Sequence, residues 1–308
     1  MLKDDGIDRR GFLKCMQWAG TGLLWTMSGG VPVSRLLGQQ SKRPAQGEFS
    51  FVQISDSHIG FNRDANKDVA GTLQAAIAKI NAALVQPEFL VHTGDITQLS
   101  KPDEFDTAAQ LLQGATTKDV FYVPGEHDVM GGGKQYLERY GHSPEARGWH
   151  SFDHKGVHFV GLANVWDLEG NLGRLGNEQL EWLETDLKGK SASTPIVVFA
   201  HIPLWAVYPQ WGWATSDSER ALGYLKRFGS VTVLNGHIHQ TMQKVEGNVT
   251  FHTAMSTAFP QPKPGEAASP GPMKVPAEQL RSVLGLTDVH YVPGHHALAV
   301  IDSSLDAG

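Results

Sequence analysis

From Phe49 onward, the chain alternates short apolar runs with segments whose apolar residues recur at helical spacing. Strands separated by amphipathic helices are typical of α/β proteins, because each helix packs against the sheet between two strands. Later pairs of apolar runs, such as the pair joined by a turn at Lys155 and Gly156, favour a second, mixed sheet. We therefore expect strands at 51–55, 89–93, 120–123, 148–153, 157–163, 195–200, 231–234, 249–255 and 297–302, and helices at 68–84, 104–112, 134–140, 177–187 and 218–228.

Five of the apolar runs end in Asp, His or Glu with small residues nearby. In α/β sheets, ligands bind beyond the carboxyl ends of the strands, so these endings are expected to meet. Asp56 and His58 lie two residues apart on what reads as extended chain and should point the same way, and His237 and His239 repeat this spacing. The endings are Asp56-Ser57-His58, Gly94-Asp95, Gly125-Glu126-His127-Asp128, Ala200-His201 and Gly236-His237-Ile238-His239. A single ending of this kind is weak evidence for a ligand set, but five endings at the same edge indicate a metal site.

In their order, these blocks resemble the signature of the calcineurin-like metallophosphoesterase superfamily, which reads DxH, GD, GNH followed by D or E, a lone H, and GHxH. All five occur over residues 51–239, the third with one substitution. The stretches 149–154 and 157–161 also resemble the exported bacterial branch of that family. The resemblance implies an α/β fold: a four-layer αββα sandwich of two mixed β-sheets, with the metal site at the carboxyl edge of the strands.

The resemblance also implies a reaction, the hydrolysis of phosphate mono- or diesters by a metal-bound hydroxide. Two ions about 3.5–4 Å apart could share the hydroxide and orient it in line with phosphorus. Fe, Mn and Zn are the expected metals, with the identity left open. The implied ligands are Asp56, His58 and His239 for one ion and His201 and His237 for the other, with Asp95 bridging both. His127 would face the leaving-group oxygen, and Asp128 would orient the His127 imidazole.

The third block departs from the family, because Glu126 stands where the signature has Asn. As a ligand, Glu126 would add a third carboxylate to those of Asp56 and Asp95. The added negative charge should favour an ion of higher charge, such as Fe³⁺, or make a given metal ion a weaker Lewis acid. Alternatively, Glu126 turns away and only one ion binds tightly. In the remaining alternative, the chain is an exported redox or oxygen-active metalloenzyme that reuses the scaffold.

The N-terminal segment carries a separate signal. Residues 8–14, Asp-Arg-Arg-Gly-Phe-Leu-Lys, resemble a twin-arginine export signal. We therefore expect the twin-arginine translocation machinery to deliver the protein to the periplasm or cell envelope, with a signal and linker over 1–45 and one catalytic domain over 46–308. Cleavage is expected between Gly29 and Gln46, but there is no clean Ala-x-Ala site, so an uncleaved anchor stays open. A soluble basic and hydrophobic helix is the alternative.

The composition of the chain argues against a thiolate metal ligand, a membrane span and a nucleic-acid partner. Cys15, the only cysteine, lies in the signal, so the mature protein would have no thiolate ligand. The apolar stretch at 15–27 is too short and too polar for a stable membrane span, which needs about 20 apolar residues. A net charge of −6 without a Lys/Arg run argues against nucleic acid as a partner. A small phosphate ester is the expected partner.

Four aromatic residues follow the His201 loop closely: Trp205, Tyr208, Trp211 and Trp213. They could line a substrate pocket, because aromatic faces orient organic groups, or they could simply pack the loop onto the sheet. The stretch 260–276, rich in Pro, Gly, Ala and Ser, is expected to be a surface excursion.

Several further histidines have weaker patterns. His92 lies three residues before Asp95, should face the opposite side of its strand and is expected to be a core histidine. His150 and His154 are expected to belong to a hairpin, whereas His252, His295 and His296 could reach the site from C-terminal strands.

Overall fold

The computed structural model describes residues 22–28, 31–37, 47–117, 119–141, 147–294 and 298–306. The chain divides into two units, Met1–Gln46 and Gly47–Gly308. In the first unit, β1 (Gly22–Ser28) pairs antiparallel with β2 (Val31–Leu37). The predicted export signal at 8–14, Cys15, and the pair His295 and His296 lie outside the described residues. Of the helices in the described ranges, none has both the length and the apolar character to cross a membrane.

The second unit contains a five-stranded sheet in the order β13-β12-β3-β4-β5. Strands β3, β4 and β5 are parallel to one another, whereas β12 is antiparallel to β3 and β13 is antiparallel to β12. The strands are β3 Phe49–Ile54, β4 Leu90–His92, β5 Val120–Tyr122, β12 Gly285–Tyr291 and β13 Ala299–Ser304. The helices that follow β3, β4 and β5 are α2 Val69–Asn81, α3 Pro102–Leu112 and α4 Lys134–Tyr140.

The other sheet has six strands in the order β10-β11-β9-β8-β7-β6. Strands β7, β8, β9 and β11 are parallel, and the edge strands β6 and β10 are antiparallel to their neighbours. The strands are β6 His150–His154, β7 Val157–Leu162, β8 Ile196–Ala200, β9 Val231–Asn235, β10 Met242–Glu246 and β11 Val249–Thr253. The remaining helices are α5 Asn177–Lys188, α6 Ser218–Leu225, the short α7 Leu280–Val283, and the 3-10 turns η1 Met130–Gly132, η2 Pro209–Trp211 and η3 Ala277–Gln279.

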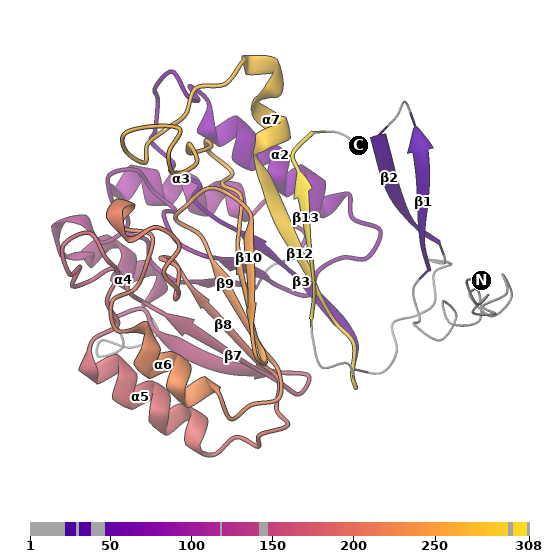
Figure 1. The fold of residues 1–308 in the computed structure, drawn as a ribbon. Helices are drawn as coiled ribbons and strands as arrows, with labels where there is room; N and C mark the ends of the chain where they lie inside the picture. The colour runs from indigo at the N-terminus through magenta and orange to yellow at the C-terminus, as the bar shows by residue number, and fades with distance from the viewer. Residues whose placement is uncertain are drawn as a thin grey trace, which may run out of the picture. The chain divides into compact units, whose positions relative to one another are not determined.

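Strand β8 shows how the two sheets share one core. Ile196 and Val198 pack with residues of α5 and α6, whereas Val197 and Phe199 pack with residues of the five-stranded sheet. Because successive strand residues face opposite sides, a strand that is apolar throughout must be covered on both faces. Helices cover the outer face of each sheet and the inner faces meet (Figure 1). The predicted fold class, two mixed sheets between helices, is confirmed.

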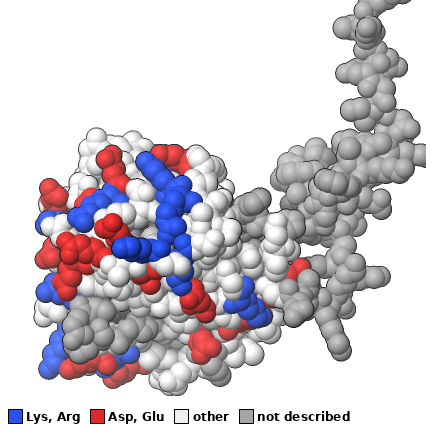
Figure 2. All heavy atoms as spheres, turned by 90° about the horizontal axis from the view of Figure 1, so that it is seen from below, with Lys and Arg blue, Asp and Glu red and all other residues white. Residues whose placement is uncertain are grey.

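In the second unit, the predicted elements are present with small shifts of their ends, and strands β10 and β12 and the short helix α7 are additions; β1 and β2 of the first unit are also not among the predicted strands. Strand β10 is mostly exposed, and β12 lies inside the five-stranded sheet, paired on both sides. Figure 2 shows one face of the molecule, on which Lys and Arg side chains lie among Asp and Glu side chains.

Candidate metal centre

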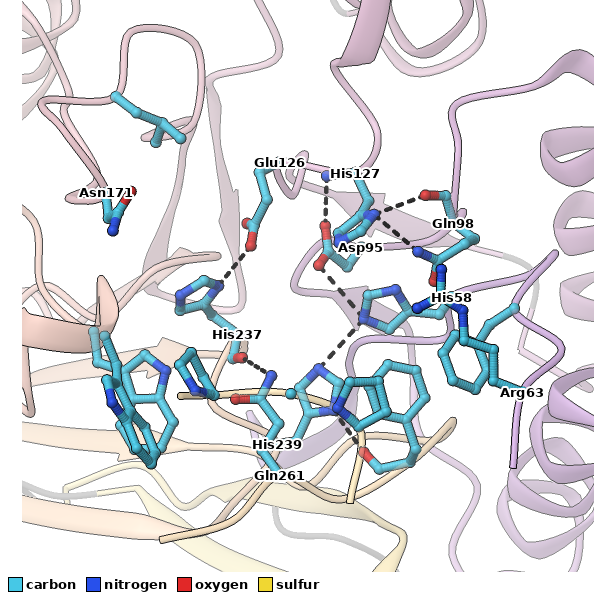
Figure 3. A pocket seen from close by; sticks show the side chains of 18 residues that line it. His58, Arg63, Asp95, Gln98, Glu126, His127, Asn171, His237, His239 and Gln261 are labelled. Atoms are coloured by element: carbon cyan, nitrogen blue, oxygen red, sulfur yellow. Dashed lines mark hydrogen bonds and ion pairs between the residues drawn. The ribbon is translucent and has the colours of Figure 1, made fainter. Parts of the chain in front are cut away.

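The five predicted strand endings lie at the carboxyl ends of β3, β4, β5, β8 and β9, and their side chains converge from both sheets. Figure 3 shows the side chains from four of these endings: His58, Asp95, Glu126, His127, His237 and His239. Ligand atoms fall within 4.8 Å of one another in four overlapping groups. The groups are Asp56, His58 and His239; Glu126, His201 and His237; Asp56, Asp95 and His201; and His58, Asp95 and His127. The structure therefore brings together every residue that the sequence predicted as a metal ligand.

The backbone is left-handed at the ligand residues of three endings, those after β3, β4 and β9, and the predicted extended chain at Asp56 and His58 is wrong. Their φ angles are 54° and 42°, and those of Asp95, His237 and His239 are 51°, 69° and 53°. Non-glycine residues in this region cost roughly 1–2 kcal/mol each, and such strain concentrates at functional sites. Backbone hydrogen bonds between loops hold the turns: Asp56 N donates to Gly94 O at 3.0 Å, and His58 N donates to Asp95 O at 2.9 Å.

Two glycines permit the loops to approach one another. A β-carbon at Gly125 would lie 2.1 Å from Asp95 Oδ1, and one at Gly236 would lie 2.0 Å from Ser55 Oγ. Real β-carbons do not approach other atoms this closely, so any side chain would displace the carboxylates of the site.

The first group is built around Asp56. His239 Nε2 lies 3.2 Å from Asp56 Oδ1 and 3.3 Å from His58 Nε2. Asp56 Oδ2 is the more fully occupied oxygen, because Ser55 Oγ donates to it alone, whereas the backbone N–H of His237 is shared between Oδ2 at 3.1 Å and Oδ1 at 3.2 Å. The other carboxylate oxygen, with the two imidazole nitrogens, faces the common space.

The second group is built around Glu126, which points inward. Glu126 Oε2 lies 2.9 Å from His201 Nε2, and Oε1 lies 3.0 Å from His237 Nδ1. Asp95 joins the two groups, since its Oδ2 lies 3.5 Å from His58 Nε2 and 3.5 Å from His201 Nε2.

The donor set fits metal cations. His201 Nδ1–H donates to Thr93 O at 2.7 Å and His239 Nδ1–H donates to Phe259 O at 2.6 Å, which leaves each Nε2 lone pair facing the site. His201 Nε2 and Glu126 Oε2 are buried and lie 2.9 Å apart without hydrogen-bond geometry, and a cation bound by both would satisfy them.

The electrostatics of the site also call for positive charge. Within the described residues, histidines are the ion-pair partners of all three carboxylates. Burial by itself would lower the pKa of His201, but the Asp95 and Glu126 carboxylates raise it well above its usual value. Without metal, the carboxylates therefore favour the protonated form of the buried His201 imidazole. Metal ions bound in the same space could supply this positive charge instead.

A chain of hydrogen bonds runs beneath Asp56 and connects the two sheets. Gln53 Nε2 on β3 donates to Asn235 O on β9 and to Thr93 Oγ1, both at 3.0 Å. Thr93 Oγ1 donates to Ser55 Oγ at 2.7 Å, and Ser55 Oγ donates to Asp56 Oδ2. Every hydroxyl therefore directs its hydrogen toward the carboxylate, which fixes the oxygen that remains for a metal.

We expect Ser55→Ala to weaken metal binding by about 10- to 100-fold, because it removes the last donor of this chain. Competition with a chromogenic chelator measures the affinity. Ser50→Ala is the matched control, since Ser50 is a buried serine on β3, the strand that ends just before Ser55, and the substitution is expected to leave the affinity unchanged. Equal affinities in both variants would contradict a role for the chain in positioning Asp56.

His127 and Asp128 do not contact each other as predicted. His127 Nδ1–H donates to Gln98 O at 2.7 Å, so the Gln98 carbonyl orients the imidazole. Asp128 instead accepts backbone N–H groups from Ile96, Thr97 and Gly125 at 2.9–3.1 Å, and so ties the β4 and β5 loops together. The predicted orienting role of Asp128 is therefore corrected to one of holding these loops.

The environment shifts the pKa of both groups upward. Burial would lower the pKa of His127, but the charges of Asp95 and Glu126 raise it above its usual value. Burial and the charge of Asp95 raise the pKa of Asp128 to about 7, against the three backbone donors.

A pocket of about 530 Å³ adjoins the metal groups. Of the aromatic residues after His201, Trp211 and Trp213 line this pocket, whereas the Trp205 ring packs 5.0 Å from that of Phe251 in the core. Both predicted roles for the aromatic residues therefore occur. The 260–276 excursion also lines the pocket, through Pro270, Gly271 and Pro272.

Polar residues that carried no sequence signal also line the pocket: Arg63, Gln98, Asn171 and Gln261. Several other histidines lie outside the metal groups, including His92, His154 and His252. His92 is buried and bonds Ser57 Oγ at 2.8 Å, His252 pairs with Asp302 at 2.9 Å, and His154 pairs with Glu88 at 2.7 Å. Burial lowers the pKa of His92 to about 4, as suits a core histidine.

A family model described as calcineurin-like phosphoesterase matches residues 49–241. A "Glycerophosphodiester phosphodiesterase GpdQ" from Enterobacter lignolyticus is 25% identical over 224 residues, covering 68% of this chain and 78% of the relative. A "Probable cyclic nucleotide phosphodiesterase" from Rhodococcus erythropolis is 23% identical over 234 residues, covering 68% and 71%.

Among solved structures, a dimetal phosphatase from Danio rerio has a TM-score of 0.63 at 14% identity, covering 84% of this chain and 96% of that one. A purple acid phosphatase from yellow lupin has a TM-score of 0.61, also at 14% identity, covering 85% and 53%. These two structures share the fold of this chain. The alternative of a redox or oxygen-active enzyme receives no support from any of these comparisons.

Proposed function

Because the chain belongs to the calcineurin-like phosphoesterase family, it is a phosphoric ester hydrolase, and we propose that it cleaves phosphodiesters at a site for two metal ions. One observation carries the proposal: two groups of buried carboxylates and imidazoles share Asp95 between them. The curated relatives named as phosphodiesterases support diesters as the substrate class.

In this proposal, Asp56, His58 and His239 would hold one ion, Glu126, His201 and His237 would hold the other, and Asp95 would be shared between the two groups. Bound ions supply Lewis acidity to the phosphoryl oxygens and lower the pKa of a coordinated water. Glu126 supports the second ion because it points at both histidines of its group. Glu126 gives this site one more carboxylate than the family signature. The added negative charge favours an ion of higher charge, such as Fe³⁺, or makes a given ion a weaker Lewis acid.

The other residues of the pocket orient and protonate the substrate. His127 holds its Nδ1–H against Gln98 O, so its Nε2 is the nitrogen available to the pocket. From there it donates a proton to the departing oxygen or stabilises negative charge on it. Trp211 provides an apolar surface for the organic part of the ester, and the buried Trp213 ring packs edge-on against it.

Hydrolysis of bis(4-nitrophenyl) phosphate tests the function. Protein freed of metal and reloaded with Mn, Fe, Zn or Co is expected to release 4-nitrophenolate, and chelator-treated protein is expected not to. Failure to turn over with every one of these metals would contradict the proposal.

The chain is also proposed to act in the periplasm or cell envelope after twin-arginine export. The paired arginines within residues 8–14 support this. Fractionation of expressing cells tests it, and protein confined to the cytoplasm would refute it.

A further inference from the structure

We propose that Arg63 binds a second anionic group of the substrate, so that the preferred substrates are phosphodiesters whose leaving alcohol carries a carboxylate or a phosphate. This inference rests on the proposed phosphodiesterase function and names the substrate class of the same pocket.

Arg63 is the one lysine or arginine among the described residues that line the pocket. Residues of the metal groups line the same pocket and are proposed to serve the phosphoryl group that reacts. A cation on the wall, separate from those groups, has no role in holding the metals. Its charge is suited to an anion elsewhere on the substrate.

The guanidinium of Arg63 is available for such a ligand. The neighbouring carboxylate, Asp64, is shared by two other cations: Lys67 Nζ lies 3.4 Å from Asp64 Oδ1 and Lys274 Nζ lies 3.8 Å from Asp64 Oδ2. Within the described ranges, Arg63 forms neither an ion pair nor a side-chain hydrogen bond.

The backbone that carries Arg63 is nevertheless fixed. Arg63 and Asn66 form an isolated bridge, in which Asn66 N donates to Arg63 O at 3.0 Å. The buried Asn66 side chain in turn donates to Ala258 O at 2.7 Å and to Thr72 Oγ1 at 3.1 Å. A free guanidinium on an anchored turn can bind an anion without first ordering the loop.

The position of Arg63 assigns it to the leaving portion of the substrate. Figure 3 shows Arg63 on the side of the pocket where His58, Gln98 and His127 lie, across from Glu126, His237 and Asn171. Because His127 is proposed to serve the leaving oxygen, the group that extends beyond that oxygen meets Arg63. The planar guanidinium can then form paired, charge-assisted hydrogen bonds with a carboxylate or phosphate.

Two chromogenic esters with matched leaving groups test this inference: methyl 4-nitrophenyl phosphate and the methyl phosphodiester of 5-hydroxy-2-nitrobenzoic acid, which adds a carboxylate to the same nitrophenol. For the wild-type enzyme, we expect kcat/KM for the carboxylated ester to exceed that for the plain ester by about tenfold, the size expected for a charge-assisted hydrogen bond. Arg63→Gln should abolish this preference and leave the plain ester within about twofold. Arg63→Lys should keep part of the preference. Lys67→Gln, which removes a neighbouring cation outside the pocket, should keep all of it.

A wild-type enzyme without the preference, or an Arg63→Gln variant that loses activity equally on both esters, would overturn the inference while leaving the proposed function intact. Calorimetric titration with 5-hydroxy-2-nitrobenzoate and with 4-nitrophenol identifies the opposite case, in which the anion site exists but the proposed function fails. Arg63-dependent binding of the carboxylated phenol alone, without turnover of either ester, would sustain the anion site and refute the phosphodiesterase.

Discussion

Asp95→Asn is expected to lower kcat/KM for bis(4-nitrophenyl) phosphate by about 10³-fold or more. Asp95 is the carboxylate shared by the two metal groups, and its Oδ2 faces His58 and His201 at equal distances. The amide keeps the shape but removes the charge that holds two cations together. Losing several kcal/mol of charge stabilisation corresponds to a rate loss of this size.

The same variant should lose metal, which elemental analysis measures directly. Asp153→Asn is the matched control. Asp153 lies on β6, pairs with His158 at 2.8 Å and with Lys190 at 2.7 Å, and belongs to none of the metal groups. The control should retain its metal and its rate within about twofold, as distant surface substitutions usually do. Full activity in Asp95→Asn would show that the two groups do not act as one centre.

His127→Ala is expected to separate metal binding from proton transfer. Its ring is held by Gln98 O, so both ions should remain bound. General acid catalysis contributes about 10²–10⁴-fold, so kcat/KM for alkyl phosphodiesters should fall by that factor. Nitrophenyl esters should fall much less, since 4-nitrophenolate departs without a proton.

His154→Ala controls for removing a histidine outside the metal groups, because His154, the last residue of β6, pairs with Glu88. Two results would contradict the assigned role of His127. Equal losses on alkyl and nitrophenyl esters would exclude a proton donor. A loss of one ion would make His127 a ligand instead, as its proximity to His58 and Asp95 permits.

The meeting of the five strand endings could be predicted from the sequence, because the carboxyl ends of parallel strands gather at one edge of a sheet. Asp95 and His201 each follow a short apolar run, and each lies at the expected end of β4 or β8. Gly125 and Gly236 mark the turns where another loop comes too close for a side chain. These signals are local, so a single sequence reveals them.

The conformation of the turns could not be predicted, because contacts between distant loops decide it. Nothing local marks Asp56 or His58 as left-handed, since such φ angles are usual only for glycine. The hydrogen bond from His58 N to Asp95 O connects the loop after β3 with the loop after β4 and holds this backbone geometry. Asp128 was misassigned for the same reason, because its partners at Ile96 and Thr97 lie some thirty residues earlier in the chain.

The two unpredicted strands of the second unit, β10 and β12, lack the pattern that identifies a strand. In β10, Lys244 and Glu246 interrupt the apolar residues, and its pairing with β11 is what makes the segment a strand. In β12, polar residues such as Thr287 are buried by pairing with β3 on one side and β13 on the other. Tertiary pairing overrides weak local preference in both segments.

Metal content measures the central claim most directly. Elemental analysis of natively expressed protein, purified without chelators, should give about two ions per chain, and the Asp95→Asn variant should give about one or fewer. Wild-type protein that retains no metal, or that holds a single ion unaffected by Asp95→Asn, would contradict the two-ion centre.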